Sequence, residues 1–568
     1  MRSVALIITF LITPLAFAAQ KEPRKPNILF IALDDLNDWI GCLGGHPQTI
    51  TPNLDRLAAS GILFSNAHCP ATACNPSRTA IMTGISPSTS GMYSNRQVMR
   101  EILPDTKIIS QYFRDHGYHA AGSGKMLHYF TDAQSWDEYY PAKESENPIP
   151  ESLDPPVRPA SLPIGGPWQY TDTDWSPVET TDKDFGGDYL VTQYVSEQLS
   201  KTHEKPLFLA CGIYRPHEPW FVPAKYFKPF PLDSIQLPPG YKKDDLADLP
   251  EGSKRYTNNR YFDHITAEGQ WKKGIQGYLA SIHYADAMLG RVLDALEKGP
   301  NADNTIVILW SDHGWQLGEK ERWQKYSPWR DVTRVPLMIK VPKNLATNLP
   351  AGTPAGAVCN APVNLISMQP TLIALAGLPS NPNAKAPDLT PLLKNPKASW
   401  PHHSTTYLAQ RGAYTTSATD WTHIHYQNGD EELYHIASDP HEWTNLANKP
   451  EHQAKLAEMQ KLAPANFAPA PEASFASLPT LTWQPSTEKP TTTTDNTNPQ
   501  VDIQFLNNTG KPLQLNNTLT PENTPLPVGK KTKIRSYLGG TWIVLNSENK
   551  IIGSFKVGDR KAKAIIPK

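Results

Sequence analysis

The main pattern along this chain is a set of short apolar runs, each ending abruptly in polar residues. The runs cover residues 27–33, 206–212 and 305–311. They are continuously apolar and of strand length, which predicts buried strands. Helical patterns lie between them, for example at residues 53–60 and 277–298. Buried strands that alternate with helices predict a parallel or mixed sheet with helices on both faces.

Each apolar run is followed by side chains that can act as acids, bases or metal ligands. Asp34 and Asp35 follow the first run, His217 lies after the second, and Asp312 and His313 follow the third. In open α/β sheets, ligands bind beyond the carboxyl ends of the strands. Three strand ends therefore deliver carboxylates and imidazoles to one rim, and we expect the active site there.

The run from Cys74 to Gly84 predicts a short helix with a cysteine at its beginning. Pro76 and Ser77 suit the first turn of a helix, and Gly84 suits its end. The positive field of a helix N-terminus lowers a thiol pKa and stabilises a bound anion. Cys74 and Arg78 together indicate a reactive side chain that faces an anionic substrate, with a structural cysteine beside a helix cap as the alternative.

The three carboxylates predicted at this rim repel one another unless a cation lies between them. Asp34 and Asp35 are adjacent at a strand end, where both can turn toward one ion, and Asp312 offers a third carboxylate. Hard divalent cations prefer such oxygen ligands. The sequence therefore predicts a metal site, with a helix-capping Asp35 and a solvated Asp34 as the alternative.

Composition narrows the class of protein. With 568 residues the chain is too long for one ordinary core, and we expect two or more domains. The net charge of −1 creates no global field that would attract nucleic acid or a membrane surface. The five cysteines are too few for a disulfide framework, and their odd number leaves at least one unpaired.

The N-terminus has the pattern of a signal peptide. Arg2 precedes an apolar run at residues 4–17, and small residues at 16–18 suit a cleavage site. We expect residues 1–19 to be a signal peptide and the protein to be periplasmic or secreted. The run is short for a membrane span, so no integral span is expected, with an uncleaved anchor as the alternative.

The C-terminal part of the chain has a different pattern from the rest. After residue 401 the chain becomes more β-like, and residues 464–500 have the Pro, Ala, Ser and Thr content of a linker. Residues 501–568 alternate apolar and polar positions between turns, which predicts a small β domain. Its many lysines would suit a polyanion, with a merely solvated face as the alternative. The sequence does not indicate its partner.

Two long segments, residues 141–184 and 230–266, have the character of surface loops. Loops of this length in a compact domain are usually functional or mobile. We expect them to take part in substrate selection.

The pattern C-x-P-S-R-x-x-x-T-G at residues 74–84 resembles the signature of type I sulfatases, whose cysteine is oxidised to formylglycine before folding. Further features of the family match in the same order along the chain. They are the Asp34-Asp35 pair, Gly124-Lys125 followed by His128, then His217, the Asp312-His313 pair and finally Lys325. The resemblance covers residues 25–462. It implies an α/β, alkaline-phosphatase-like sandwich, in which a large mixed, mostly parallel sheet lies between helices and a smaller antiparallel subdomain follows.

The resemblance and the composition together divide the chain. We expect a catalytic α/β domain at residues 20–400, a C-terminal subdomain at 401–463, a linker at 464–500 and a small all-β domain at 501–568. Two short runs of the last segment, at 505–510 and 536–542, resemble the β domain of von Hippel–Lindau-type proteins.

The resemblance implies a role for each matched residue. The implied catalytic residues are Cys74, Arg78, Lys125, His128, His217 and Lys325. The implied metal ligands are Asp34, Asp35, Cys74, Asp312 and His313. Most of the family has Asp-Asn where this chain has Asp312-His313, and residues 312–327 look most like iduronate-2-sulfatases. This departure leaves open whether His313 binds the ion directly, and whether the ion is Ca²⁺ or Mg²⁺.

The implied mechanism begins with formylglycine at position 74, whose hydrate supplies a hydroxyl nucleophile. The cation, Arg78, Lys125 and Lys325 would neutralise the sulfate oxygens. His217, assisted by Lys325, would protonate the departing alcohol. His128 would then remove the proton of the second hydroxyl and expel sulfate.

These features predict an exported sulfatase that acts on a sulfated glycan, with 2-O-sulfated uronic acid as the favoured substrate, and that depends on a formylglycine-generating maturation enzyme. One alternative is a phosphonate or phosphate ester hydrolase of the same superfamily. Another is a non-catalytic protein that binds polyanionic glycans. The balanced charge argues against a nucleic-acid partner.

Overall fold

The computed structural model describes residues 25–567 of the chain with several gaps. The gaps are residues 145–146, 151–160, 164–172, 258–259, 344, 346–347, 471–477, 479, 491–499, 518–519, 538 and 559–561. The predicted signal peptide, residues 1–19, lies outside the described residues, as does part of the predicted linker. Among the helices in the described ranges, none combines the length and apolar character needed to cross a membrane.

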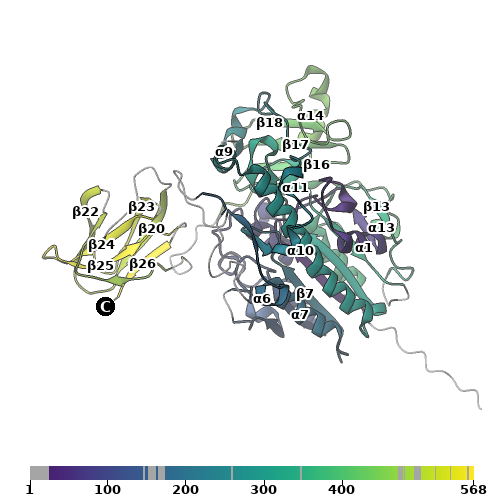
Figure 1. Cartoon of the computed structure of the whole chain (residues 1–568), viewed down its shortest axis with the longest axis horizontal. Helices are drawn as coiled ribbons and strands as arrows, with labels where there is room; N and C mark the ends of the chain where they lie inside the picture. The colour runs from purple at the N-terminus through teal and green to yellow at the C-terminus, as the bar shows by residue number, and fades with distance from the viewer. Residues whose placement is uncertain are drawn as a thin grey trace, which may run out of the picture.

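An eight-stranded sheet forms the centre of the main body (Figure 1). Its strands, in order across the sheet, are β13 (Ala357–Cys359), β2 (Ile62–Phe64), β12 (Leu337–Lys340), β9 (Thr305–Ser311), β1 (Asn27–Leu33), β7 (Leu207–Ile213), β4 (His119–Gly124) and β5 (Glu138–Tyr140). Strands β9, β1, β7, β4 and β5 run parallel to one another. Strand β12 is antiparallel to both β9 and β2. The sheet is therefore mixed and mostly parallel, which confirms the predicted fold class.

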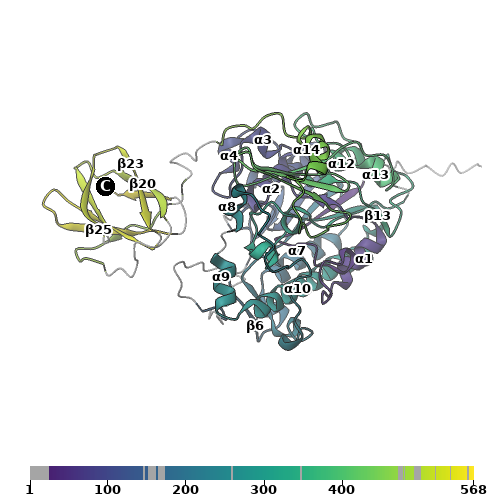
Figure 2. The same ribbon diagram turned by 90° about the horizontal axis from the view of Figure 1, so that it is seen from above.

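The two faces of the sheet each bury an apolar core, because successive side chains of a strand point to opposite sides. Leu29 and Ile31 of β1 belong to one core, and Phe30 and Ala32 belong to the other. The first core is covered by α1 (Pro52–Ser60), α7 (Asp188–Leu199) and α10 (Trp271–Lys298). The second is covered by α2 (Cys74–Thr83), α5 (Ile109–Asp115), α12 (Met368–Leu375) and α13 (Thr390–Lys394). Figure 2 shows α10 on one side of the sheet and α2, α12 and α13 on the other.

The smaller elements join or cover these layers. The short helices are α3 (Pro87–Ser90), α4 (Met99–Ile102), α6 (Asp182–Phe185), α8 (Lys254–Thr257), α9 (Arg260–Ala267) and α11 (Arg330–Thr333). The short strands are β3 (Ala67–His68), β6 (Trp175–Val178), β8 (Trp220–Pro223), β10 (Gln316–Leu317), β11 (Trp323–Gln324) and β14 (Val363–Asn364).

The loop interpretation of residues 230–266 is wrong in part, because α8 and most of α9 lie within it. Phe262 and Ile265 of α9 are buried in the first core, and this spacing places both on one face of a helix. In the other predicted loop, residues 141–184, the described part contains β6 and the beginning of α6.

Two further β structures follow the main body. A four-stranded antiparallel sheet consists of β15 (Ser404–Tyr407), β16 (Tyr414–Ser417), β17 (Trp421–His425) and β18 (Glu431–His435), and α14 (Gln453–Gln460) follows it. The C-terminal domain contains a sheet of β19 (Gln484–Pro485), β25 (Ile551–Lys556), β24 (Thr541–Leu545), β21 (Leu513–Asn517) and β22 (Thr520–Leu526). Its second sheet contains β23 (Lys531–Tyr537), β20 (Gln500–Asn507) and β26 (Ala562–Ile566), and one apolar core lies between the two sheets.

The C-terminal β domain includes residues that precede position 501. The backbone N–H of Leu481 donates to the carbonyl oxygen of Lys563 at 2.8 Å, and the Trp483 ring lies 5.0 Å from the Phe555 ring, centroid to centroid. These residues fall in the segment whose composition indicated a linker. Their apolar side chains pack against the core of the domain, so composition alone misplaced this boundary.

We expect Gly124→Ala to destabilise the fold strongly. Gly124 ends β4 with φ of 76°, a conformation that costs other residues about 1–2 kcal/mol. The added Cβ atom would also lie closer to the Gly212 carbonyl oxygen than the 3.0 Å minimum seen for Cβ atoms. This steric clash adds a cost of about 1–3 kcal/mol. Gly117→Ala is the matched control, because φ is 90° there but no heavy atom lies within 4 Å. Equal losses in the free energy of unfolding for the two variants would contradict this account.

Candidate active site

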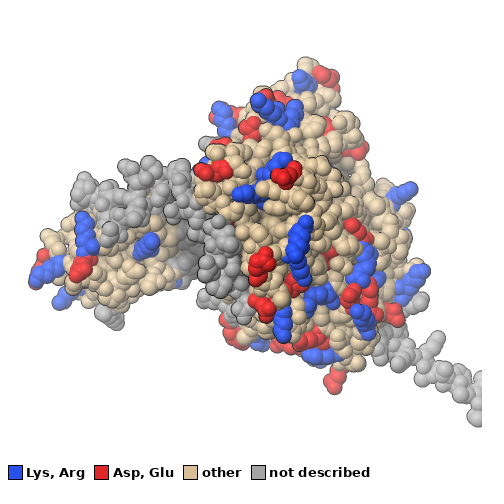
Figure 3. All heavy atoms as spheres, in the orientation of Figure 1, with Lys and Arg blue, Asp and Glu red and all other residues tan. Residues whose placement is uncertain are grey.

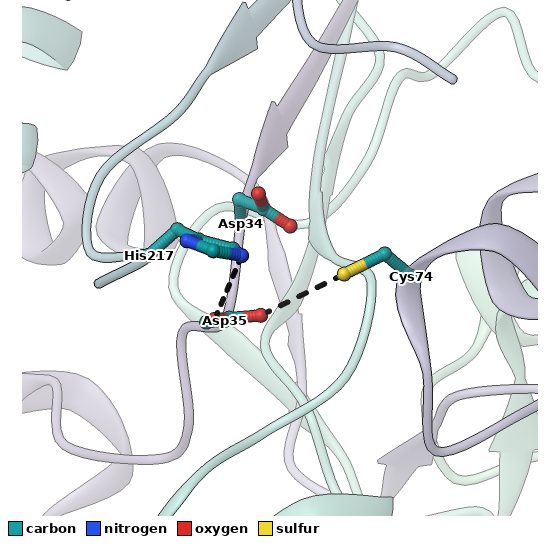
Figure 4. Close-up of side chains that lie close together, drawn as sticks. All are labelled: Asp34, Asp35, Cys74 and His217. Atoms are coloured by element: carbon teal, nitrogen blue, oxygen red, sulfur yellow. Dashed lines mark hydrogen bonds and ion pairs between the residues drawn. The ribbon is translucent and has the colours of Figure 1, made fainter. Parts of the chain in front are cut away.

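The carboxyl ends of two adjacent strands, β1 and β9, place acidic residues at one point, next to the end of β7. Leu33, the last residue of β1, pairs with Ser311 of β9 and with Ile213 of β7. Asp34, Asp35 and Asp312 follow directly and are almost completely buried, with at most 1% of each exposed. Asp35 has φ of 63°, so the chain turns sharply after β1. Figure 4 shows Asp34 and Asp35 facing the same space as Cys74 and His217.

Helix α2 presents Cys74 to this space from the opposite side. Cys74 is the first residue of the helix, and Gly84, with φ of 75°, ends it, as the sequence predicted. Every residue of α2 is buried. The Cys74 Sγ atom lies 3.1 Å from Lys325 Nζ, 3.2 Å from His313 Nε2 and 4.0 Å from an Asp35 carboxylate oxygen. Position 74 is therefore in contact with both the cationic and the acidic groups of the site.

Each of the three carboxylates has a buried cationic partner. Lys125, which follows β4, donates to Asp34, and Lys325, which follows β11, donates to Asp35 at 2.9 Å. Arg78 bridges two of the carboxylates, because its guanidinium donates to Asp34 at 3.1 Å and to Asp312 at 2.8 Å. This pairing compensates charge that would otherwise be very costly to bury.

The field of these cations acts on the buried acids. Burial alone would raise the pKa of the Cys74 thiol, but the charges of Lys125 and Lys325 hold it well below its usual value. Burial likewise opposes ionisation of Asp34, yet Lys125 and Arg78 keep its pKa far below the ordinary range. An anion at position 74 is thus stabilised by the same groups that would stabilise a substrate anion.

His313 turns one ring nitrogen into the site. Its Nδ1 lies 3.1 Å from the carbonyl oxygen of Gly314, and this oxygen can only accept, so Nδ1 carries the hydrogen. Its Nε2 then faces Cys74 Sγ, with Asp35 and Asp312 oxygens at 3.5 and 3.6 Å. A backbone carbonyl commonly orients a metal-binding histidine in this way. The geometry therefore allows His313 to be a direct ligand.

His217 is held in the same manner on the far side of Asp35. Its Nδ1 donates to the carbonyl oxygen of Glu218 at 2.5 Å, and its Nε2 lies 3.3 Å from Lys325 Nζ. Burial lowers the pKa of His217, but the Asp35 carboxylate raises it, and the net pKa is above the usual value. A protonated His217 can therefore donate from Nε2 into the site.

His128 completes the predicted set. It is partly buried, and burial lowers its pKa below the ordinary value, although the nearby Cys74 opposes this lowering. A neutral histidine beside position 74 is suited to accept a proton. The structure thus places all the predicted catalytic and metal-binding residues in one cluster.

The buried oxygen-rich cluster suits a hard divalent cation. Two groups of side chains place their ligand atoms within 4.8 Å of one another, namely Asp34, Asp35, Cys74 and His217, and Cys74, Asp312 and His313. Three carboxylates with one imidazole form a plausible donor set for Ca²⁺ or Mg²⁺. The donors do not distinguish between the two ions.

Two supporting residues escaped the sequence interpretation. Tyr278 of α10 donates its hydroxyl hydrogen to the backbone carbonyl of Asp35 at 2.7 Å, and Ser77 donates to the carbonyl of Asp312 at 2.6 Å. Both hold the strand ends in place. Ser77 lies inside the Cys74 run and could have been suspected, whereas Tyr278 lies within an ordinary amphipathic helix and carries no local signal.

Comparison with known proteins decides the family. The sequence model of the family described as Sulfatase matches residues 26–378, which is more than half of the chain. The chain belongs to the sulfatase family. As a sulfatase it is an enzyme that hydrolyses sulfate esters, and the cluster around Cys74 is its candidate catalytic site.

Individual relatives agree with this assignment. A sulfatase of Formosa agariphila is 38% identical over 460 residues, which are 79% of this chain and 88% of that protein. The iduronate 2-sulfatase of Mus musculus is 33% identical over 64% of this chain and 70% of its own length. A solved structure of a 2-O GAG sulfatase superposes with a TM-score of 0.58 at 21% identity, covering 77% and 91% of the two chains. This last likeness shows the fold alone.

We expect Arg78→Lys to destabilise this sulfatase and to reduce its turnover. A lysine lacks the planar fork that lets the guanidinium contact Asp34 and Asp312 from separate nitrogens, so at least one buried charge-assisted hydrogen bond is lost, at a cost of about 1.5–3 kcal/mol. Arg56→Lys is the control, because Arg56 pairs with Asp294 at the surface, where such pairs contribute about 0–1 kcal/mol. Chemical unfolding and aryl sulfate hydrolysis measure both effects. Equal behaviour of the two variants would contradict the bridging role.

Proposed function

We propose that this sulfatase removes sulfate from a sulfated glycan and that its substrate unit is a 2-O-sulfated uronic acid. The proposal also assigns formylglycine to position 74 and a divalent cation, either Ca²⁺ or Mg²⁺, to the acidic cluster. The similarity to an iduronate 2-sulfatase and the Asp312-His313 pair support the choice of substrate. The carboxylates around position 74 support the choice of a hard cation.

The observation that carries the proposal is the position of Cys74 between the acidic strand ends and the buried cations. A sulfate ester carries its negative charge on the oxygens around sulfur. Lys125 and Lys325 lie 3.9 and 3.1 Å from Cys74 Sγ, close enough to contact the oxygens of a sulfate group held there. Such preorganised charge in a dry site is commonly the largest contribution to catalysis.

The residues around position 74 can move the protons that the reaction requires. Formylglycine in its hydrated form supplies a hydroxyl nucleophile, and a divalent cation supplies Lewis-acid charge. His217 would donate from Nε2 to the departing alcohol oxygen, with Lys325 beside it. His128, which interacts electrostatically with position 74, would accept a proton there. Asp34, Asp35, Asp312 and His313 would hold the cation.

Maturation and location belong to the same proposal. Cys74 has no exposed surface in the folded chain, so an oxidising enzyme would need to reach it before the chain folds. We therefore propose a formylglycine-generating enzyme as a partner. The apolar run at residues 4–17 supports export to the periplasm or beyond the cell.

We expect Cys74→Ala to abolish hydrolysis of an aryl sulfate while the protein still folds. The mutation removes the precursor of the nucleophile. The wild-type chain, made together with the maturation enzyme, should show the mass of formylglycine in the peptide that contains position 74. Cys69→Ala is the matched control, because Cys69 is also fully buried but its thiol donates to the backbone carbonyl of Val332 at 3.6 Å. An intact thiol at position 74 in fully active protein would refute the formylglycine mechanism.

The substrate assignment predicts a preference among sulfated sugars. Disaccharides with a 2-O-sulfated uronic acid should be hydrolysed with a kcat/KM at least about 10-fold above that of isomers sulfated on the hexosamine, because contacts to the uronate contribute only when it carries the sulfate. Sulfate release measures the two rates. A reversed order would refute the uronate assignment. Faster turnover of an aryl phosphate than of an aryl sulfate would favour an alternative phosphoesterase activity.

A further inference from the structure

The C-terminal β domain differs sharply in charge from the rest of the chain. Residues 501–568 contain eleven Lys and Arg residues against four Asp and Glu residues, a net charge of +7. The preceding 500 residues contain 43 against 51, a net charge of −8. The near-neutral total therefore conceals a basic domain attached to an acidic catalytic part. In Figure 1 this domain lies beside the main body, and Figure 3 shows blue patches of Lys and Arg on its visible side.

The strand pattern of β23 concentrates part of this charge on one face. Lys531, Lys533 and Arg535 are exposed, whereas Ile534 packs against the core of the domain. Arg535 is 71% exposed and Lys533 is 53% exposed. Because alternate residues of a strand share a face, the three cationic side chains form a row with a spacing of about 7 Å.

The neighbouring strands extend the same face. Gln504 of β20 pairs with Lys533 of β23 on one side and with Lys563 of β26 on the other, so these side chains point outward together. Among the described outward-facing residues of the three strands, the acidic side chain is Asp502, which lies 3.2 Å from Lys533 and 3.7 Å from Arg535. We call Lys531, Lys533, Arg535 and Lys563 the basic face.

The opposite side of this sheet makes the basic face a rigid platform. Ile503 and Phe505 of β20 and Ala564 of β26 are completely buried against the other sheet of the domain. The positions of the cations are thus set by backbone pairing across three strands. A row of exposed cationic side chains held at fixed spacing can contact successive sulfate groups of a long polyanion.

We propose that the basic face binds the sulfated glycan polymer and holds it near the catalytic body. This inference rests on the proposed glycan substrate. The catalytic part has a net negative charge, which opposes the approach of a polyanion, so the basic β domain supplies the long-range attraction. A tethered polymer raises the local concentration of sulfate esters at the active site without adding a contact there.

The test compares full-length proteins on immobilised dextran sulfate, with unsulfated dextran as the blank. The face variant combines Lys531→Gln, Lys533→Gln and Arg535→Gln. The matched control combines Lys511→Gln, Lys550→Gln and Lys556→Gln, which are exposed in the same domain and remove the same charge. The face variant should bind about 10-fold more weakly near 50 mM salt, with a shallower salt dependence, because fewer counterions are released. The control should stay within about twofold of the wild type.

Aryl sulfate hydrolysis, measured on the same proteins, separates this inference from the proposed function. All three proteins should hydrolyse the small ester equally, whereas the face variant should show a higher KM on a sulfated polymer. Equal binding of the two variants to dextran sulfate would overturn the inference, whatever the activity. Binding of the wild type to anionic lipid vesicles but not to dextran sulfate would also overturn it. Face-dependent binding without any ester hydrolysis would support the inference and count against the proposed function alone.

Discussion

The active site depends on the mutual compensation of three buried carboxylates and three buried cations. Asp34, Asp35 and Asp312 would be prohibitively costly to bury as ions if Arg78, Lys125 and Lys325 did not contact them. The same cations would be equally costly without the carboxylates. The cluster is therefore stable only as a whole, and Cys74 occupies the point where the two sets meet. A divalent cation and the sulfate group of a substrate would add charges of opposite sign to the same arrangement.

The central sheet determines where this cluster forms. Strands β1, β7 and β9 are adjacent and parallel, so their carboxyl ends lie at one edge. Their apolar side chains alternate between two cores, which hold the strand ends rigidly under helices on both faces. Rigid strand ends matter because catalytic charges must be held in place before the substrate arrives. The backbone carbonyls of Glu218 and Gly314 extend this control by orienting the two histidines.

The chain also separates two electrostatic tasks. The active site keeps its cations, Arg78, Lys125 and Lys325, buried and paired, where salt hardly screens them. The C-terminal β domain exposes its cations on an outer sheet face, where they act over longer distances but weaken with salt. A polymeric substrate would use both, because the polymer must be retained while individual sulfate groups are removed. One chain of almost zero net charge can thus carry two opposite local fields.

The sequence by itself determined three strands of the central sheet, the helix that begins at Cys74 and the residues at the strand ends, because these follow from local periodicity and from motifs with fixed spacing. It also indicated that Asp34, Asp312 and Lys125 belong to one site. Only the tertiary structure showed that Arg78 bridges two carboxylates, that Tyr278 supports Asp35 and that residues 480–485 pack onto the β domain. These contacts join residues far apart in the chain. Their partners are chosen by packing, which no local pattern records.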